Sequence, residues 1–152
     1  MMTISLHPIG VVSNSRKTIS DDHWGDVVSQ IQLVDSIPTE SLLQIELFSH
    51  LEIIYFFDRL ASETIVYSGR PRENPAYPEM GIFSQRKKDR PNHLGLCTVQ
   101  LLGHVDRMIM VKGLDAIDGT PVLDIKPVFR EYLPKGTVMQ PSWATELMQH
   151  YW

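Results

Sequence analysis

The sequence predicts a mainly β fold, a small antiparallel β-barrel with a few short helices. Several short runs of β-branched and aromatic residues are separated by turn residues, a pattern typical of all-β sandwiches and barrels. Only two segments, residues 39–47 and 140–152, have the features of helices. A chain of 152 residues has the length of one domain, which is therefore expected to span residues 1–152.

Seven runs predict β-strands, because each is rich in β-branched or aromatic residues or alternates between apolar and polar positions. They are residues 4–13, 27–34, 50–60, 81–84, 94–102, 106–114 and 122–125. Polar or Pro-rich stretches predict loops over residues 14–25, 68–79 and 85–92.

Three of these strands carry more detailed expectations. The five consecutive apolar residues from Ile53 predict a strand that is buried on both faces. Gly103 and His104 are expected to join the paired strands on either side of them. Asp118-Gly119 predicts a tight turn before the last strand.

Both helical segments begin with suitable chemistry. Pro38 and Thr39 offer a start for a short helix or turn over residues 39–47. Pro141-Ser142 offers a second start near the C-terminus. One face of this second helix would carry residues spaced four apart, and we expect it to pack on the core. These residues are Trp143, Leu147 and Tyr151.

Composition narrows the class of protein. Cys97 is the only cysteine, which excludes an internal disulfide and a multi-cysteine zinc site. The sequence shows neither a signal-peptide pattern at residues 1–10 nor an apolar run of membrane-spanning length. We therefore expect a soluble cytoplasmic protein without a membrane partner.

Charge is distributed unevenly along the chain. The formal net charge is −4, which argues against broad nonspecific binding to nucleic acid. Residues 70–90 nevertheless carry six Lys or Arg against three acids. Such a local excess indicates either an anionic ligand or a solvated loop, and charge alone does not separate the two.

The segment Gly81 to Gly95 is the first candidate for chemistry. Pro91 favours an extended backbone at Arg90, so this guanidinium is held by a stiff chain and suits a carboxylate or phosphate. Asn92 offers both a donor and an acceptor to the edge of a heterocycle. The alternative is an ordered loop with an internal ion pair between Asp89 and an arginine.

The Asp118-Gly119 turn is the second candidate. Its amides and the hydroxyl of Thr120 could bind a ligand. The alternative is a turn in which the Asp side chains cap backbone amides, and from the residues alone this alternative is favoured. Calcium binding is a weak interpretation, because the spacing of the aspartates fits no known loop.

A third candidate is the loop of residues 20–25, where Trp24 lies among acids. An exposed indole could stack on a cationic or aromatic ligand. A Trp24 that folds back to close one end of the barrel is the favoured alternative.

Other chemistries find no support. The six histidines lack metal-binding spacing, so no metal is expected. Cys97 lies within an apolar strand and is interpreted as a core residue. The sequence contains none of the usual nucleophile, P-loop or dinucleotide motifs.

Five motifs occur together and in order, and together they resemble the TsaA-like family, whose best-known member type is tRNA methyltransferase O. They are Pro8-Ile9-Gly10-Val11-Val12-Ser13, Phe48-Ser49-His50-Leu51, Gly81-Ile82-Phe83-Ser84-Gln85-Arg86, Arg90-Pro91-Asn92-His93-Leu94-Gly95 and residues 118–127 (DGTPVLDIKP). The resemblance covers roughly residues 8–130. It implies a small, mostly antiparallel β-barrel that binds S-adenosylmethionine, often as a homodimer with the cofactor near the interface.

The resemblance also implies the positions of the site residues. Cofactor contacts would come from Arg90, Leu101, the turn Asp118, Gly119, Thr120 and Pro121, the loop Asp22, His23, Trp24 and Gly25, and the pair Asp58 and Arg59. The basic segment suggests substrate contacts from Arg86, Lys87, Lys88 and Asn92. No strong base is needed, because a sulfonium methyl donor is already activated and the enzyme mainly aligns the acceptor. The candidates for proton removal are Asp118, His93 and His50.

We therefore expect an S-adenosylmethionine-dependent methyltransferase, with tRNA as its partner and N6 of a threonylcarbamoyl-adenosine beside the anticodon as the acceptor. Two alternatives remain open. One is a methyltransferase of a small metabolite, and the other is a regulatory module that binds S-adenosylmethionine without turnover.

Overall fold

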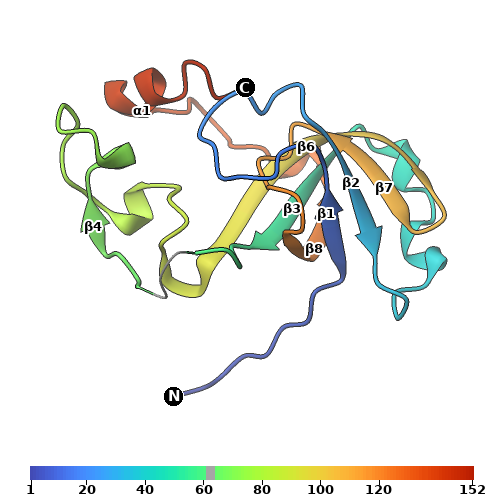
Figure 1. The fold of residues 1–152 in the computed structure, drawn as a ribbon. Helices are drawn as coiled ribbons and strands as arrows, with labels where there is room; N and C mark the ends of the chain where they lie inside the picture. Colours follow the sequence, from blue (N-terminus) through green and yellow to red (C-terminus); the bar gives the residue numbers. More distant parts are fainter. Residues whose placement is uncertain (61–63) are drawn as a thin grey trace.

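A computed structural model of the chain describes residues 1–60 and 64–152. Six strands form a closed barrel in which every neighbouring pair is antiparallel, in the order β1-β2-β7-β6-β3-β8 (Figure 1). The strands are β1 (Gly10–Ser13), β2 (Val28–Leu33), β3 (His50–Phe56), β6 (Leu94–Val105), β7 (Met108–Lys112) and β8 (Pro121–Pro127). The predicted fold class is confirmed.

Short helical turns and a small hairpin complete the structure. The 3-10 helices are η1 (Thr39–Leu42), η2 (Ile45–Leu47), η3 (Pro71–Glu73), η4 (Ile82–Ser84), η5 (Pro91–His93) and η6 (Arg130–Tyr132). A two-stranded sheet pairs β4 (Ser68–Gly69) with β5 (Met80–Gly81), and α1 (Ser142–Leu147) is the one α-helix of the described chain. Residues 39–47, where a short helix or turn was predicted, form the two 3-10 helices η1 and η2.

The barrel interior is an aliphatic core that alternate residues of each strand supply. Buried and exposed positions alternate along β2 and along the first half of β6, as the period of two requires. The core includes Val12, Ile31, Leu33, Leu51, Ile53, Val99, Ile109, Val111, Leu114 and Val122, all less than 4% exposed. Cys97 also lies in this core as a free thiol.

Strand β3 corrects the expectation that both of its faces are buried. Leu51, Ile53 and Tyr55 point into the core, whereas Ile54 and Phe56 on the other face are only partly covered. The strand is central, with β6 on one side and β8 on the other, but a barrel has a single interior. The run of five apolar residues therefore predicted more burial for β3 than the barrel provides.

The β6–β7 hairpin turns later than expected. Strand β6 continues through Gly103 and His104 to Val105, so the turn falls at Asp106-Arg107, where Asp106 has φ 48. The register shifts between Leu101 and Gly103, so the glycine marks a β-bulge inside the strand.

Two other strands are shorter than predicted. Strand β1 begins at Gly10 rather than at residue 4, and Pro8 before it lacks the N–H that a ladder hydrogen bond needs. In the expected strand 81–84, only Gly81 belongs to β5, and the chain then turns into η4.

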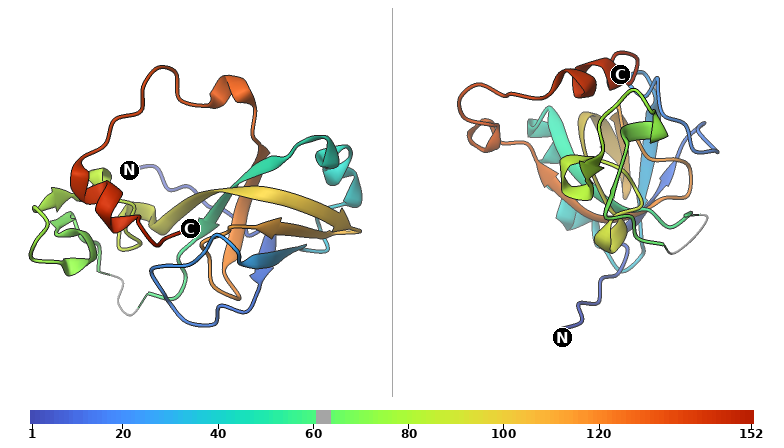
Figure 2. Two further views of the ribbon diagram at one scale, coloured as in Figure 1. Left: turned by 90° about the horizontal axis from the view of Figure 1, so that it is seen from above. Right: turned by 90° about the vertical axis from the view of Figure 1, so that its left-hand side faces the viewer.

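The C-terminal segment corrects a further expectation. Helix α1 ends at Leu147 instead of running to the C-terminus, and Trp143 lies near the ring of Tyr77, with centroids 6.2 Å apart, outside the barrel core. The linker of residues 128–141 bows away from the barrel before α1 (Figure 2, left). No helix of the described residues is long and apolar enough to cross a membrane.

Candidate functional site

Several segments that are distant in sequence meet at one end of the barrel, which we call the Asp118 end. Strands β1 and β3 end here, and β6 and β8 begin here. Backbone hydrogen bonds join the segments: Phe57 donates to the carbonyl of His93, and Asp118 donates to the carbonyl of Arg16. The Asp118 end comprises residues 14–25, 57–60, 85–94 and 113–121.

Arg59 lies directly against Gly119. A methyl group added at Gly119 would stand 2.2 Å from Nη2 of Arg59, and Gly119 has φ 86, in the left-handed region that favours glycine. Two of the predicted cofactor segments, 60 residues apart in the chain, are thus in contact. The Arg59 guanidinium is exposed and offers a fork of donors to a carboxylate.

The carboxylate of Asp118 is fixed from two sides. It accepts a hydrogen bond from the backbone amide of Asn14 (3.0 Å), and Nζ of Lys17 lies 2.9 Å away. The bond from Lys17, then that from the Asn14 amide, holds the pKa of Asp118 below its usual value. An acid of low pKa is a weak proton acceptor, so Asp118 is better suited to orient a ligand than to act as a base.

The amides of the Asp118 turn are bonded within the chain. The amides of Asp118, Gly119 and Thr120 donate to the carbonyls of Arg16, Val12 and Ile117. The hydroxyl of Thr120 donates to Ile117 as well, and the residue is buried. These donors stabilise the turn itself. The group of the turn that could contact a ligand is therefore the Asp118 carboxylate.

Trp24 is buried rather than exposed, as the favoured alternative predicted. Its indole donates to the carbonyl of Ser20, and the guanidinium of Arg16 lies 4.1 Å from the ring centroid. Arg16 also donates to the carbonyls of Asp22 and His23. Trp24 and Arg16 therefore build the loop, and its neighbour His23 is exposed.

Asp22 in the same loop forms an ion pair across 50 residues. Arg72 donates to both of its carboxylate oxygens, at 2.7 and 3.3 Å. The Arg72 hydrogen bond is the largest cause of the lowered pKa of Asp22. Arg72 adopts φ 48 to reach this position, which is uncommon for a residue other than glycine.

Arg90 has the extended backbone that Pro91 predicted, with φ −117 and ψ 160. One guanidinium nitrogen, Nη1, donates to the carbonyl of Gln85 at 2.8 Å. The following Asn92 and His93 have positive φ, of 65 and 50. The loop is therefore tightly wound, and Arg90 is anchored through one nitrogen.

The basic segment is largely paired within the chain. Lys87 lies 3.8 Å from Glu73, and Lys88 lies 3.4 Å from Asp89, so the ion pair expected between Asp89 and an arginine is formed by a lysine. Arg86 donates to the carbonyl of Leu96, and Arg70 donates to the carbonyl of Tyr77. Its cations are less available to an anionic partner than their number suggests.

Two predicted site residues lie away from the Asp118 end. Leu101 is seven residues along β6 from Leu94, about 23 Å in an extended strand. Its amide donates to the carbonyl of Ser49, just before β3 begins. His50, the first residue of β3, is exposed there and bonds Ser49 through Nδ1 at 2.7 Å. Leu101 nevertheless pairs with Val111 of β7, two residues before the segment 113–121.

The structure also brings together residues that sequence reasoning missed. Tyr55 donates to Oδ1 of Asp115 at 2.6 Å, and Tyr151 donates to Oδ2 of the same carboxylate. Burial, and then the Asp115 charge, raise the pKa of both tyrosines. No sequence signal links these three, because Tyr55 stands in an apolar run and Tyr151 lies 36 residues from Asp115.

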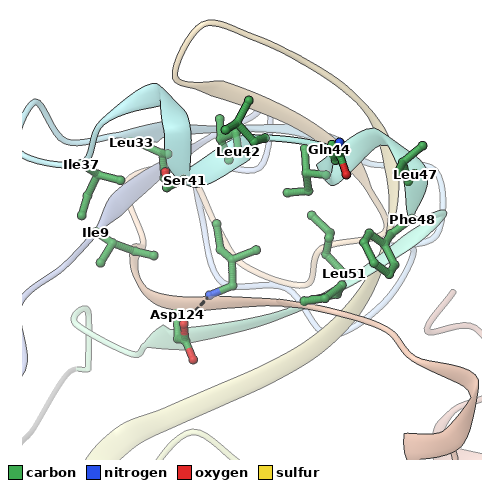
Figure 3. Close-up of a pocket in the computed structure, with 14 residues that line it drawn as sticks. Ile9, Leu33, Ile37, Ser41, Leu42, Gln44, Leu47, Phe48, Leu51 and Asp124 are labelled. Carbon is green, nitrogen blue, oxygen red and sulfur yellow. Dashed lines mark hydrogen bonds between the residues drawn. The ribbon is translucent and has the colours of Figure 1, made fainter.

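A pocket of about 530 Å³ opens at the other end of the barrel (Figure 3). Aliphatic side chains from Leu33, Ile37, Leu42 and Leu51 dominate its wall, and Asp124 is its charged residue. None of the predicted cofactor residues lines it. It offers no cation to a carboxylate, so the Asp118 end is the better candidate for an amino-acid-bearing ligand.

We next considered metal-binding sites. Within residues 1–60 and 64–152, no group of three or more His, Cys, Asp or Glu side chains is placed to hold an ion. Burial raises the pKa of Cys97, and its thiol donates to the carbonyl of Gly113 at 3.2 Å, so this cysteine is a structural residue.

Comparison with known proteins places this geometry in context. Residues 19–133 match the family described as the tRNA-methyltransferase O N-terminal domain. A crystal structure of TrmO from P. aeruginosa superposes with a TM-score of 0.74 at 24% identity, covering 94% of this chain and 62% of that one. This likeness shows a shared fold.

Relatives in sequence carry two kinds of name. A probable S-adenosyl-L-methionine-binding protein of Methanothermobacter thermautotrophicus is 36% identical over 86% of this chain and 93% of its own length. The human tRNA (adenine(37)-N6)-methyltransferase is 40% identical over 68% of this chain and 23% of its own. A probable S-adenosyl-L-methionine-binding protein of Archaeoglobus fulgidus is 35% identical over 84% of this chain, which spans about 34% of that relative's length.

Proposed function

The chain belongs to the tRNA-methyltransferase O N-terminal domain family, and from this premise we propose that it is an S-adenosylmethionine-dependent methyltransferase of tRNA. The acceptor is N6 of the threonylcarbamoyl-adenosine beside the anticodon. The observation that carries the proposal is the contact of Arg59 with Gly119, which brings an exposed arginine to the turn that the family resemblance assigns to the cofactor.

The chemistry of the Asp118 end fits S-adenosylmethionine. The cofactor carries a carboxylate, for which the guanidinium groups of Arg59 and Arg90 are matching donors. Its amine and ribose hydroxyls are matched by the Asp118 carboxylate, which Lys17 and Asn14 hold in place. Gly119 leaves room for the close approach of Arg59, and Pro121 follows it at the start of β8.

The remaining family positions take supporting parts in this proposal. Trp24 and Thr120 are buried, and Asp22 is paired with Arg72. These residues therefore stabilise the loops of the Asp118 end. His23 of the same loop is exposed, Gly25 packs against the backbone of Trp152, and Asp58 adjoins Arg59. Leu101 is proposed to line the pocket from β6, where it pairs with Val111 of β7, two residues before the segment 113–121.

When bound, the cofactor supplies an activated methyl group. The chain therefore has to orient the acceptor nitrogen and accept one proton. Of the three candidates, His93 is the one we propose for this proton, because His50 lies at the other end of the barrel and Asp118 has a lowered pKa. His93 is half-buried and lies edge-on against Phe56, with ring centroids 6.1 Å apart, and its Nδ1 is 3.4 Å from the carbonyl of Lys88.

The anticodon loop is proposed to bind beside the cofactor, over the surface that carries Asn92 and the cations Arg86, Lys87 and Lys88. Asn92 is exposed at the tip of η5, where its amide is free to meet the edge of a base. The four cations of residues 86–90 give this surface its positive charge.

We further propose a cytoplasmic homodimer. The linker of residues 128–141 exposes several large apolar side chains, and such a patch favours contact with a second copy. They are Phe129, Tyr132, Leu133, Val138 and Met139. Sedimentation of the protein tests the assembly, and the free thiol of Cys97 is consistent with a reducing compartment.

Methyl incorporation from radiolabelled S-adenosylmethionine tests the function. We expect label in tRNA that carries threonylcarbamoyl-adenosine and none in tRNA that lacks this modification. No transfer to the modified tRNA would refute the proposed substrate. Calorimetric binding without release of S-adenosylhomocysteine would instead support a regulatory module.

A further inference from the structure

We infer that Tyr151 is a positioning residue of the cofactor site, which holds the C-terminal tail, residues 148–152, against the loop of residues 22–25. The inference rests on the proposed function, because that loop belongs to the proposed cofactor site. Tyr151 lies beyond residues 19–133, so the family match does not extend to it.

The tail touches the loop through its backbone. The amide of His23 donates to the carbonyl of His150 at 2.9 Å, and the amide of Trp24 donates to the carbonyl of Tyr151 at 2.7 Å. A methyl group at Gly25 would stand 2.7 Å from the carbonyl carbon of Trp152. The loop and the tail therefore pack backbone against backbone, with no space for a side chain at Gly25.

The loop adopts a conformation that needs such support. His23 has φ 65, in the region that residues other than glycine rarely adopt. The two bonds from the tail fall on His23 and on the next residue, Trp24. Loss of the tail would leave both amides without these acceptors and would free the backbone at its least favourable point.

Tyr151 anchors the tail to the barrel. Its hydroxyl donates to Oδ2 of Asp115, and Oδ1 of that carboxylate accepts from Tyr55, a buried residue of β3. Hydrogen bonds to an ionised carboxylate are stronger than neutral ones. A continuous series of contacts thus runs from the core through Asp115 and Tyr151 to the loop.

A second set of contacts holds the same loop from another side. Arg72 pairs with Asp22 at 2.7 Å, and Tyr77 in the same segment lies near Trp143 of α1. Helix α1 lies above the β4 segment in Figure 1, and the tail then runs toward the barrel. The loop is therefore clamped between the tail and the segment of residues 70–77.

The test compares Tyr151→Phe with Tyr67→Phe, which removes an exposed hydroxyl just before β4. In Tyr151→Phe, amide hydrogen exchange is expected to rise about tenfold at His23 and Trp24, and not in β3. The dissociation constant for S-adenosylmethionine is expected to rise about fivefold, because a charge-assisted hydrogen bond is lost. Tyr67→Phe is expected to match the wild type in both measurements.

A variant that acts through Asp115 gives a second readout. In an Asp115→Asn background, Tyr151→Phe is expected to change cofactor affinity by less than about twofold, because the two substitutions affect the same contact. The inference is overturned if Tyr151→Phe alone leaves the exchange of both amides and the affinity unchanged. If the wild type binds no cofactor while exchange at His23 and Trp24 still rises, the proposed function fails and the support of the loop by the tail stands.

Discussion

Arg59 and Gly119 are in contact although 60 residues separate them, and a methyl group at Gly119 would stand 2.2 Å from Nη2 of Arg59. The contact joins the end of β3 to the turn before β8. It explains why two segments that look unrelated in the sequence can serve one ligand. Gly119 also has φ 86, so two independent constraints require glycine there.

Gly119→Ala tests this contact. We predict a loss of about 1–2 kcal/mol in the free energy of unfolding from the left-handed backbone alone. The displaced Arg59 should also lower cofactor affinity by about tenfold, the cost of one charge-assisted hydrogen bond. Denaturant unfolding and calorimetry measure the two effects.

Gly69→Ala is the matched control, because its added methyl group would meet only Val66 at an ordinary 3.9 Å. We expect it to keep both stability and affinity. Unchanged cofactor binding in a folded Gly119→Ala protein would argue against a role for Arg59.

Ile53→Ala tests the barrel core. Ile53 is fully buried in β3, between β6 and β8. Its truncation should cost about 2–5 kcal/mol in unfolding free energy, through lost burial and the cavity left behind. Leu102→Ala, at a position 46% exposed in β6, is the control and should cost far less. Equal losses would contradict the assignment of these residues to the inside and outside of the barrel.

Stability at low pH should depend on Asp118. Lys17 and the Asn14 amide lower its pKa below 3.8 in the folded protein. The ionised carboxylate therefore adds stability above the unfolded pKa of about 4, and this addition is lost as the pH falls through the lower folded value.

Asp118→Asn should thus be less stable than the wild type at pH 7, and the difference should shrink toward zero in strong acid. Chemical unfolding across this pH range measures it. Glu131→Gln, at an exposed position of η6, should leave the pH profile unchanged. An equal difference at all pH values would show that Asp118 acts through something other than its charge.

The affinity for tRNA should depend on the two paired lysines of the basic segment. Lys87 and Lys88 each lie near an acidic side chain, so each must be partly released to meet a phosphate. Lys87→Ala combined with Lys88→Ala should reduce the dependence of log affinity on log salt by about one unit or slightly more. An unchanged salt dependence would place the anticodon loop elsewhere.

The fold could be predicted from the sequence where local patterns determine the structure. Alternation at residues 27–34 predicted β2, and Asp118-Gly119 predicted its turn, because period and turn chemistry are local properties. The bulge at Gly103 was missed, since a glycine between two apolar runs also looks like a hairpin turn. Residues 4–9 resemble a strand in composition, but the ladder of β1 begins at Gly10.

Only part of the candidate site could be predicted from the sequence. Proline before Asn92 predicted the extended Arg90, which is again a local effect. The structural turn was the favoured interpretation, but the acceptors of its amides on Val12 and Arg16 were not predicted, because they lie more than 100 residues earlier. The Asp115 network and the tail were missed for the same reason: their partners meet only when the barrel closes.

A crystal structure with S-adenosylmethionine tests the central claim most directly, because it distinguishes the Asp118 end from the apolar pocket at the other end of the barrel. We predict the cofactor at the Asp118 end, with its carboxylate near Arg59 or Arg90 and its methyl group facing the η5 loop. Cofactor bound instead in the apolar pocket beside Leu51 and Asp124, or absent from the Asp118 end at saturating concentration, would contradict the account.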